Sequence, residues 1–189
     1  MMRVLAVSGS LRSASYNTRL LRNASDLFDD DVEVVELRGL KDVPAYDEDD
    51  DGVGAPEAVR RLRAAFAGAD AVLIATPEYN SSIAGHLKNA LDWISRPLGT
   101  NPLRNKPVAV IGASTGAFGA VWAQAELRRV LAAIGARVVE AELALGHAAT
   151  RFDPVGTLVD EDLREQLGEV ADALVAAAAE REELARAAA

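Results

Sequence analysis

Hydroxyl side chains and an arginine cluster where a short apolar stretch gives way to a helical pattern. The segment, residues 8–17, reads SGSLRSASYN, and its candidate phosphate ligands are Ser10, Arg12, Ser15 and Asn17. Hydroxyl, amide and guanidinium groups all donate to phosphate, and the first turn of a helix adds unpaired N–H groups with a partial positive charge. Capping of the helix by Ser13 or Ser15 explains one hydroxyl but not the cluster. We therefore predict a phosphate site here.

The pattern also indicates which kind of phosphate is bound. No G-x-G-x-x-G follows the apolar stretch, and no G-x-x-x-x-G-K-[ST] occurs anywhere in the chain. These are the glycine-rich signatures of dinucleotide-binding Rossmann units and of P-loop nucleotide hydrolases. The segment therefore favours one monoester phosphate over a pyrophosphate.

Two further polar segments follow apolar stretches of strand length. The first is TPEYNSSIAG (76–85), in which a proline stiffens a turn whose backbone amides suit the edge of a heterocycle. The second is GASTGAFG (112–119), whose glycines and small hydroxyls allow the backbone to approach a ligand closely. Either segment could line a ligand pocket.

The second of these segments carries a competing interpretation. Residues 112–116, GASTG, match the G-x-S-x-G nucleophile elbow of serine hydrolases, with Ser114 as nucleophile. That mechanism needs an acid and then a histidine later in the chain. The later histidine is His147, and the acids before it, which we expect in a helix or a strand, are Glu126, Glu140 and Glu142. The hydrolase is the less favoured alternative.

Strand and helix patterns alternate along the whole chain. Apolar runs predict strands at 3–10, 32–37, 70–77, 106–114 and 137–145. Helical spacing predicts helices at 13–28, 55–69, 85–97, 119–136 and 160–180, the last with an alanine-rich end expected to fray. This alternation predicts a single α/β domain, 1–189, with a three-layer, doubly wound sheet of five parallel strands in the order 2-1-3-4-5. The three polar segments then leave the same edge of the sheet and line one pocket.

Composition excludes several classes of protein. The chain of 189 residues has a formal charge of −9, which disfavours nucleic acid as a partner. It has no cysteine, which excludes disulfides and a thiol nucleophile, and no apolar run of about 18 residues for a membrane span. We expect a cytoplasmic protein. The acidic run 47–52 opens like a calcium loop, but Ala58 stands where the closing glutamate belongs, so we predict no metal site.

With these segments assembled, the sequence resembles the NADPH-dependent FMN reductase family of the flavodoxin-like fold, which includes chromate and quinone reductases and azoreductases. The resemblance runs from about residue 3 to residue 145 and rests on GSLRSASYN, TPEYNSSIAGHLKNALDWISR and KPVAVIGASTGAFGAVWAQAELRRVL. It implies that the FMN phosphate is held by Ser10, Arg12, Ser15, Tyr16 and Asn17. It implies that the isoalloxazine ring lies along Pro77, Glu78, Tyr79, Asn80 and Ser81. It implies that Ser114, Thr115 and Gly116 flank the ring or the ribityl chain.

The resemblance also implies an activity and partners. NADPH or NADH would reduce bound FMN, which would pass electrons to a quinone, an azo compound, a metal oxyanion or free flavin. The flavin carries this chemistry, so no side chain is expected to be catalytic. A homodimer or homotetramer is implied, with Trp93 either at a partner contact or in the core. The alternative is a flavodoxin-type electron carrier that binds FMN without turning over nicotinamide.

Overall fold

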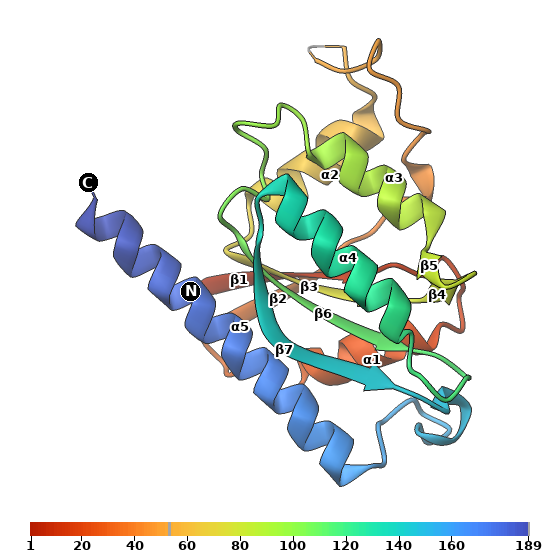
Figure 1. Cartoon of the computed structure of the whole chain (residues 1–189). Helices are drawn as coiled ribbons and strands as arrows, with labels where there is room; N and C mark the ends of the chain where they lie inside the picture. The colour runs from red at the N-terminus through yellow and green to blue at the C-terminus, as the bar shows by residue number, and fades with distance from the viewer. Residues whose placement is uncertain (53, 189) are drawn as a thin grey trace.

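Five parallel strands form the central sheet of the computed structural model, which describes residues 1–52 and 54–188 (Figure 1). The strands are β1 (Met2–Ser8), β2 (Val32–Glu36), β3 (Ala71–Thr76), β6 (Pro107–Ala113) and β7 (Arg137–Leu145). Their order in the sheet is β2-β1-β3-β6-β7, which is the predicted order 2-1-3-4-5 once the strands of this sheet are counted alone. This is the flavodoxin-like order, in which ligands bind beyond the carboxyl ends of the strands.

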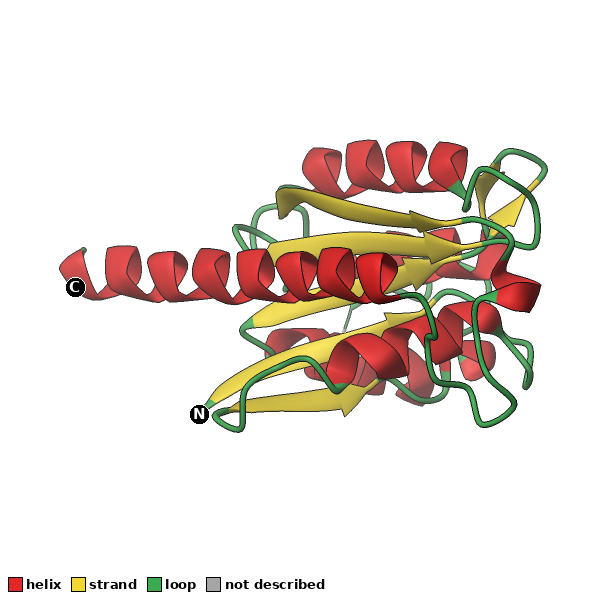
Figure 2. Cartoon of the chain, turned by 90° about the horizontal axis from the view of Figure 1, so that it is seen from below, coloured by secondary structure: helices red, strands yellow, loops and turns green. Residues whose placement is uncertain are grey.

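Helices cover both faces of the sheet, as Figures 1 and 2 show. The helices α1 (Tyr16–Ser25) and α5 (Glu161–Ala187) pack on one face. The helices α2 (Glu57–Ala67), α3 (Gly85–Ile94) and α4 (Val121–Ile134) pack on the other. Two short 3-10 turns, η1 (Leu40–Asp42) and η2 (Ala148–Thr150), lie in loops. The predicted three-layer α/β architecture is confirmed.

Each face of the sheet has its own apolar core. In β3, which is buried along its whole length, Leu73 packs against residues of α1 and α5, whereas Ile74 packs against residues of α2, α3 and α4. Successive side chains of a strand point to opposite faces, so a strand covered on both sides must be apolar throughout. Each such side chain contributes about 1.5–3 kcal/mol by burial. This rigid centre fixes the strand ends from which the polar loops leave.

Trp93 lies in the core, and the hypothesis that it contacts a partner subunit is wrong. Its side chain is fully buried, and its Nε1–H donates to the carbonyl of Pro44 at 2.9 Å. Its ring packs edge-on against that of Tyr46, with 5.0 Å between the ring centroids. The neighbouring Asp92 accepts a hydrogen bond from Lys88 at 2.7 Å on the helix surface. Trp93 is therefore one of the buried residues by which α3 packs on the sheet; the others are Leu87, Ala90, Leu91 and Ile94.

The structure differs from the sequence-based prediction in two elements. A short hairpin, β4 (Glu78–Tyr79) and β5 (Ser82–Ile83), forms within the second polar segment. Its two-residue turn places Asn80 and Ser81 in the left-handed region, with φ of 54° and 57°, as a type I′ turn requires. The end of α5, which we expected to fray, stays helical to Ala187. In Figure 2 that end extends beyond the sheet.

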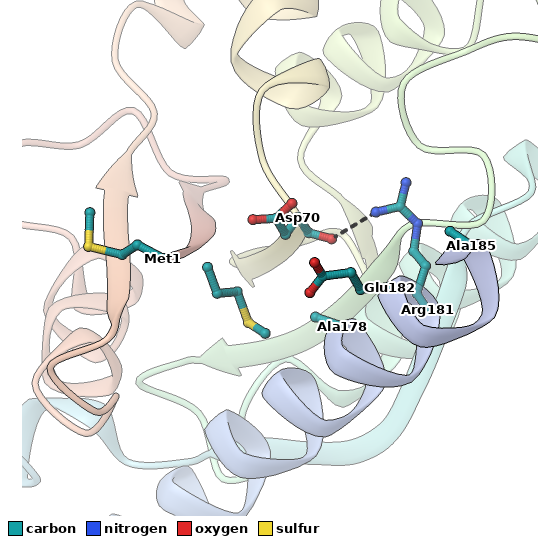
Figure 3. Close-up of a pocket in the computed structure, with 7 residues that line it drawn as sticks. Met1, Asp70, Ala178, Arg181, Glu182 and Ala185 are labelled. Atoms are coloured by element: carbon teal, nitrogen blue, oxygen red, sulfur yellow. Dashed lines mark hydrogen bonds between the residues drawn. The ribbon is translucent and has the colours of Figure 1, made fainter. Parts of the chain in front are cut away.

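A cavity of about 340 Å³ lies under the extended end of α5, next to the N-terminus (Figure 3). Arg181 lines it and donates to the carbonyl of Asp70 at 3.5 Å. Asp70 directly precedes β3, so this cavity lies at the amino ends of the strands, opposite the edge where the three polar segments leave. Within the described ranges, no helix is both long and apolar enough to cross a membrane.

Candidate functional site

The three polar segments meet in one cleft at the carboxyl ends of β1, β3 and β6. The cleft has a volume of about 120 Å³. Its lining residues are Ser10, Arg12, Ser15, Tyr16, Asn17, Pro77, Glu78, Tyr79, Ala113, Ser114 and Thr115. Ten of the thirteen predicted binding residues are among them; Asn80, Ser81 and Gly116 lie in the same loops but do not line the cleft. The sequence-based prediction missed Ala113, which lines the cleft and whose backbone is hydrogen-bonded to the side chain of Asn17.

The N-terminus of α1 lies at the cleft and has two backbone N–H groups without a hydrogen-bond partner in the described structure. Ser15 is the N-cap: its Oγ accepts from the N–H of Thr18 at 3.3 Å, and its carbonyl accepts from the N–H of Arg19 at 3.1 Å. The N–H groups in the first turn of a helix have no partner within that helix. In the described structure, the N–H groups of Tyr16 and Asn17 also have no partner outside the helix. They can therefore bind an anion.

Asn17 connects the first loop to the third. Its side chain is buried; Nδ2 donates to the carbonyl of Ala113 at 2.9 Å, and Oδ1 accepts from the N–H of Ala113 at 2.9 Å. Both atoms of the carboxamide are thus engaged with the last residue of β6. Asn17 can offer a ligand its backbone N–H, while its side chain sets the width of the cleft.

Arg12 and Ser10 form the outer wall of the first polar segment, residues 8–17, which is named the phosphate loop after the phosphate site that its sequence predicts. Arg12 is exposed, and its guanidinium donates a long hydrogen bond to the carbonyl of Ala14 at 3.5 Å, which leaves most of its donors available. The Oγ of Ser10 accepts from the N–H of Arg12 at 3.5 Å. Ser13, whose role the sequence left open, does not line the cleft but a second hollow on the outer side of the loop. It also makes no cap hydrogen bond to α1, because Ser15 is the N-cap.

Gly9 is a point of close approach between the first and second loops. Its N–H donates to the carbonyl of Ala75 at 2.8 Å, and a Cβ at this position would lie 2.8 Å from Cδ2 of Leu87 and 3.1 Å from Cδ of Pro77. The carbonyl of Gly9 accepts from Nε2 of the half-buried His86 at 2.7 Å. Burial lowers the pKa of His86, and the hydrogen bond to Gly9 offsets part of this. The imidazole therefore serves as a neutral donor that holds the phosphate loop.

The hairpin of the second loop is attached to α4 by two carboxylates. Glu78 accepts from the N–H groups of Trp122 and Ala123, both at 3.1 Å, and so caps the N-terminus of α4. Glu126 accepts from Oγ of Ser82 at 2.6 Å. The carboxylate of Glu78 is therefore engaged by α4, so Glu78 can contact a ligand through its backbone.

The third loop does not support a serine hydrolase. The Oγ of Ser114 accepts from the N–H of Gly116 at 3.1 Å, and His147 meets this loop through its backbone, donating to the carbonyl of Gly116 at 2.9 Å. Glu126, the acid closest to this loop along the chain, is engaged with Ser82. In the described part of the chain, Ser114 has no hydrogen-bonded imidazole that could act as its base. The geometry is that of a binding loop.

Known proteins are similar to this chain in both sequence and structure. Residues 2–150 match the family described as NADPH-dependent FMN reductase. An NAD(P)H-dependent FMN reductase of Pseudomonas aeruginosa is 43% identical over 91% of this chain and 92% of that protein. A 2-hydroxy-1,4-benzoquinone reductase of a Burkholderia species is 40% identical over 88% of this chain and 90% of that protein. The solved structure of the flavoenzyme NAD(P)H:(acceptor) oxidoreductase from Paracoccus denitrificans is 36% identical with a TM-score of 0.87, and the match covers 96% of this chain and 99% of that one. This chain therefore belongs to the NADPH-dependent FMN reductase family.

Proposed function

We propose that this protein is an oxidoreductase that takes electrons from NADPH or NADH through bound FMN and passes them to a small acceptor. The observation that carries the proposal is the donor set at the mouth of α1. The spare N–H groups of Tyr16 and Asn17 lie in one cleft with the hydroxyls of Ser10 and Ser15 and the guanidinium of Arg12. Neutral donors beside one cation, at the positive end of a helix, fit a dianionic monoester phosphate.

The remaining binding residues would position the ring of the cofactor. Pro77, Glu78 and Tyr79 line the cleft next to the phosphate cradle, and Asn80 and Ser81 close the hairpin that carries them. Ser114, Thr115 and Gly116 would approach from the third loop. We infer that exposed backbone amides of these loops bind the polar edge of the isoalloxazine ring, because the side chain of Glu78 is already used on α4.

The chain needs no acid–base side chain of its own for this reaction. The two-electron chemistry between nicotinamide and acceptor would be supplied by bound FMN. The loops contribute orientation and fixed dipoles, which their hydrogen bonds to β6, α3 and α4 hold in place. The name of the Burkholderia relative supports a quinone as one acceptor class. Azo compounds, metal oxyanions and free flavin remain further candidates.

We also propose that residues 1–189 form one domain that works in the cytoplasm, where its nicotinamide co-substrate is found, as a homodimer or homotetramer. Three aromatic side chains near the cleft support self-association: Tyr79 is 45%, Phe118 64% and Trp122 49% exposed. Phe118 and Trp122 meet edge-on at 5.0 Å, which forms a fixed apolar surface. A second copy of this chain is the occupant that would cover this surface and close the mouth of the cleft.

This oligomer can be tested by light scattering after gel filtration. Trp122→Ser should shift the protein to a lower mass, whereas Leu98→Ser, which changes a 55% exposed residue outside this surface, should not. A wild-type protein that elutes as a monomer would refute self-association.

The flavin proposal can be tested by absorbance. Purified protein, supplied with FMN and then desalted, should keep the flavin, and NADPH or NADH added without oxygen should bleach it. Protein that stays colourless would disprove FMN binding. Protein that holds FMN but is bleached by neither nucleotide would be an electron carrier instead of a nicotinamide-dependent enzyme.

A further inference from the structure

A second hollow lies on the outer side of the phosphate loop. It has a volume of about 270 Å³ and shares Ser10 and Arg12 with the cleft, so the two depressions are separated by one loop. Its other lining residues come from the end of β1, the loop that follows it, α1, the end of β2 and the segment that leads into η1. They are Ser8, Leu11, Ser13, Thr18, Arg22, Glu36, Leu37, Gly39, Leu40 and Lys41.

The hollow is lined mainly by positive charge, whereas the whole protein is negatively charged. Three cations, Arg12, Arg22 and Lys41, face a single carboxylate, Glu36, in a chain with a formal charge of −9. Glu36 accepts from Arg22 at 3.4 Å, and this exposed pair neutralises it. Lys41 is exposed and has no ion-pair partner within the ranges that the structure describes. The hollow therefore keeps positive charge that internal pairing does not use.

The same hollow offers apolar surface beside the cations. Leu40, which is 7% exposed, and Leu11, which is 43% exposed, both line it. The hydroxyl of Ser13, which is not needed to cap α1, also borders it. Leucine side chains can cover the face of a purine ring, while lysine, arginine and hydroxyl groups bind phosphate oxygens. This combination matches a phosphorylated adenosine better than a simple inorganic anion.

We infer that this hollow binds the adenosine 2′-phosphate end of NADPH, and that Lys41, whose charge is left over after Arg22 pairs with Glu36, makes the enzyme prefer NADPH to NADH. The inference rests on the proposed function. The nicotinamide must reach the ring in the cleft, so the adenosine half of the dinucleotide lies outside it, and this hollow shares a wall with the cleft.

Glu36 is the residue that could produce the opposite preference. A carboxylate at the end of a strand next to a phosphate loop can bind the 2′-hydroxyl of NADH and repel a 2′-phosphate. Glu36 is the last residue of β2, but Arg22 neutralises it, and Lys41 lines the same hollow. The local charge is therefore suited to a phosphate.

The test compares two fragments on the FMN-loaded protein by titration calorimetry: 2′,5′-ADP, which carries the 2′-phosphate, and 5′-AMP, which does not. We expect 2′,5′-ADP to bind at least about tenfold more tightly than 5′-AMP, as one charge-assisted hydrogen bond would give. Lys41→Gln should remove most of this difference and leave the 5′-AMP affinity unchanged. Lys88→Gln, a change of a half-buried lysine on α3 away from both depressions, should change neither affinity.

Steady-state kinetics provides the second readout. Lys41→Gln should lower kcat/KM for NADPH about tenfold without changing kcat/KM for NADH, and Glu36→Gln should leave the preference for NADPH in place. Equal affinity for the two fragments, no detectable binding of 2′,5′-ADP, or an unchanged NADPH-to-NADH ratio in Lys41→Gln would overturn the inference. FMN retention and bleaching by either nucleotide are measured separately. A protein that is reduced equally well by NADH and NADPH thus keeps the proposed function and loses only this inference.

Discussion

Replacing Asn17 by alanine should destabilise the protein even before any flavin is bound. The side chain makes two buried hydrogen bonds of 2.9 Å to the backbone of Ala113, and its removal leaves one N–H and one carbonyl at the end of β6 without these partners. An unsatisfied buried polar group costs about 1–3 kcal/mol. Because some water can enter at the cleft, we expect a loss of about 2–4 kcal/mol in the free energy of unfolding. That is a large fraction of the roughly 5–15 kcal/mol typical of a folded domain.

Urea unfolding of the flavin-free protein, followed by circular dichroism, measures this loss directly. Asn23→Ala is the matched control, because Asn23 also ties α1 to a distant loop: its Oδ1 accepts from Leu158 at 2.8 Å, and its Nδ2 donates to Gly156 at 2.9 Å. Both variants should lose stability. FMN affinity should fall about tenfold or more in Asn17→Ala only, because that change moves two walls of the cleft.

If flavin-free Asn17→Ala unfolds within about 0.5 kcal/mol of the wild type, which is the range of surface substitutions, the two hydrogen bonds to Ala113 do not hold the loops together. If, in addition, FMN binding is still lost, the Asn17 side chain acts directly on the phosphate, as the resemblance to the family first implied.

Three further predictions concern the same loops. Arg12→Ala should weaken FMN binding about tenfold in a fluorescence titration, with the melting temperature of the flavin-free protein unchanged; unchanged FMN affinity would remove Arg12 from the cradle. Gly119→Ala should lower the melting temperature strongly, because Gly119 has a φ of 58° and a Cβ there would lie 2.3 Å from the carbonyl carbon of Ala144; a normal melting temperature would contradict this. His86 has a lowered pKa in the folded protein, so below about pH 6.5 the unfolded state binds more protons and stability falls; urea unfolding at several pH values should show a flatter acid limb for His86→Gln, and parallel curves would contradict it.

The first loop could be predicted because its signals are local. The capping hydroxyl of Ser15 and the start of α1 lie within a few residues of each other, and the apolar run before them indicates a strand covered on both faces. The strand order also follows from the alternation of elements, because parallel strands joined by helices allow few arrangements. The edge of the sheet at which the candidate site lies was therefore predictable from the sequence.

The contacts that hold the loops together could not be predicted in this way. Asn17 and Ala113 are 96 positions apart, and Glu78 meets the N-terminus of α4 44 positions away. In the sequence each is one polar residue among many, and nothing local marks its partner. The hairpin was missed because its turn uses Asn80 and Ser81 in a left-handed conformation, without the glycine that usually signals such a turn.

An acidic protein that binds an anionic cofactor must keep its own carboxylates from repelling that cofactor, and here three of them are engaged by hydrogen bonds or an ion pair. Glu78 lines the cleft, but its charge is directed to the N-terminus of α4, where backbone N–H groups and the helix dipole favour it. Glu126 accepts from Ser82, and Glu36 is paired with Arg22. Each of these bonds also fixes a loop. The interactions that give the site its shape thus leave Arg12 and the start of α1 to set the potential that a phosphate meets.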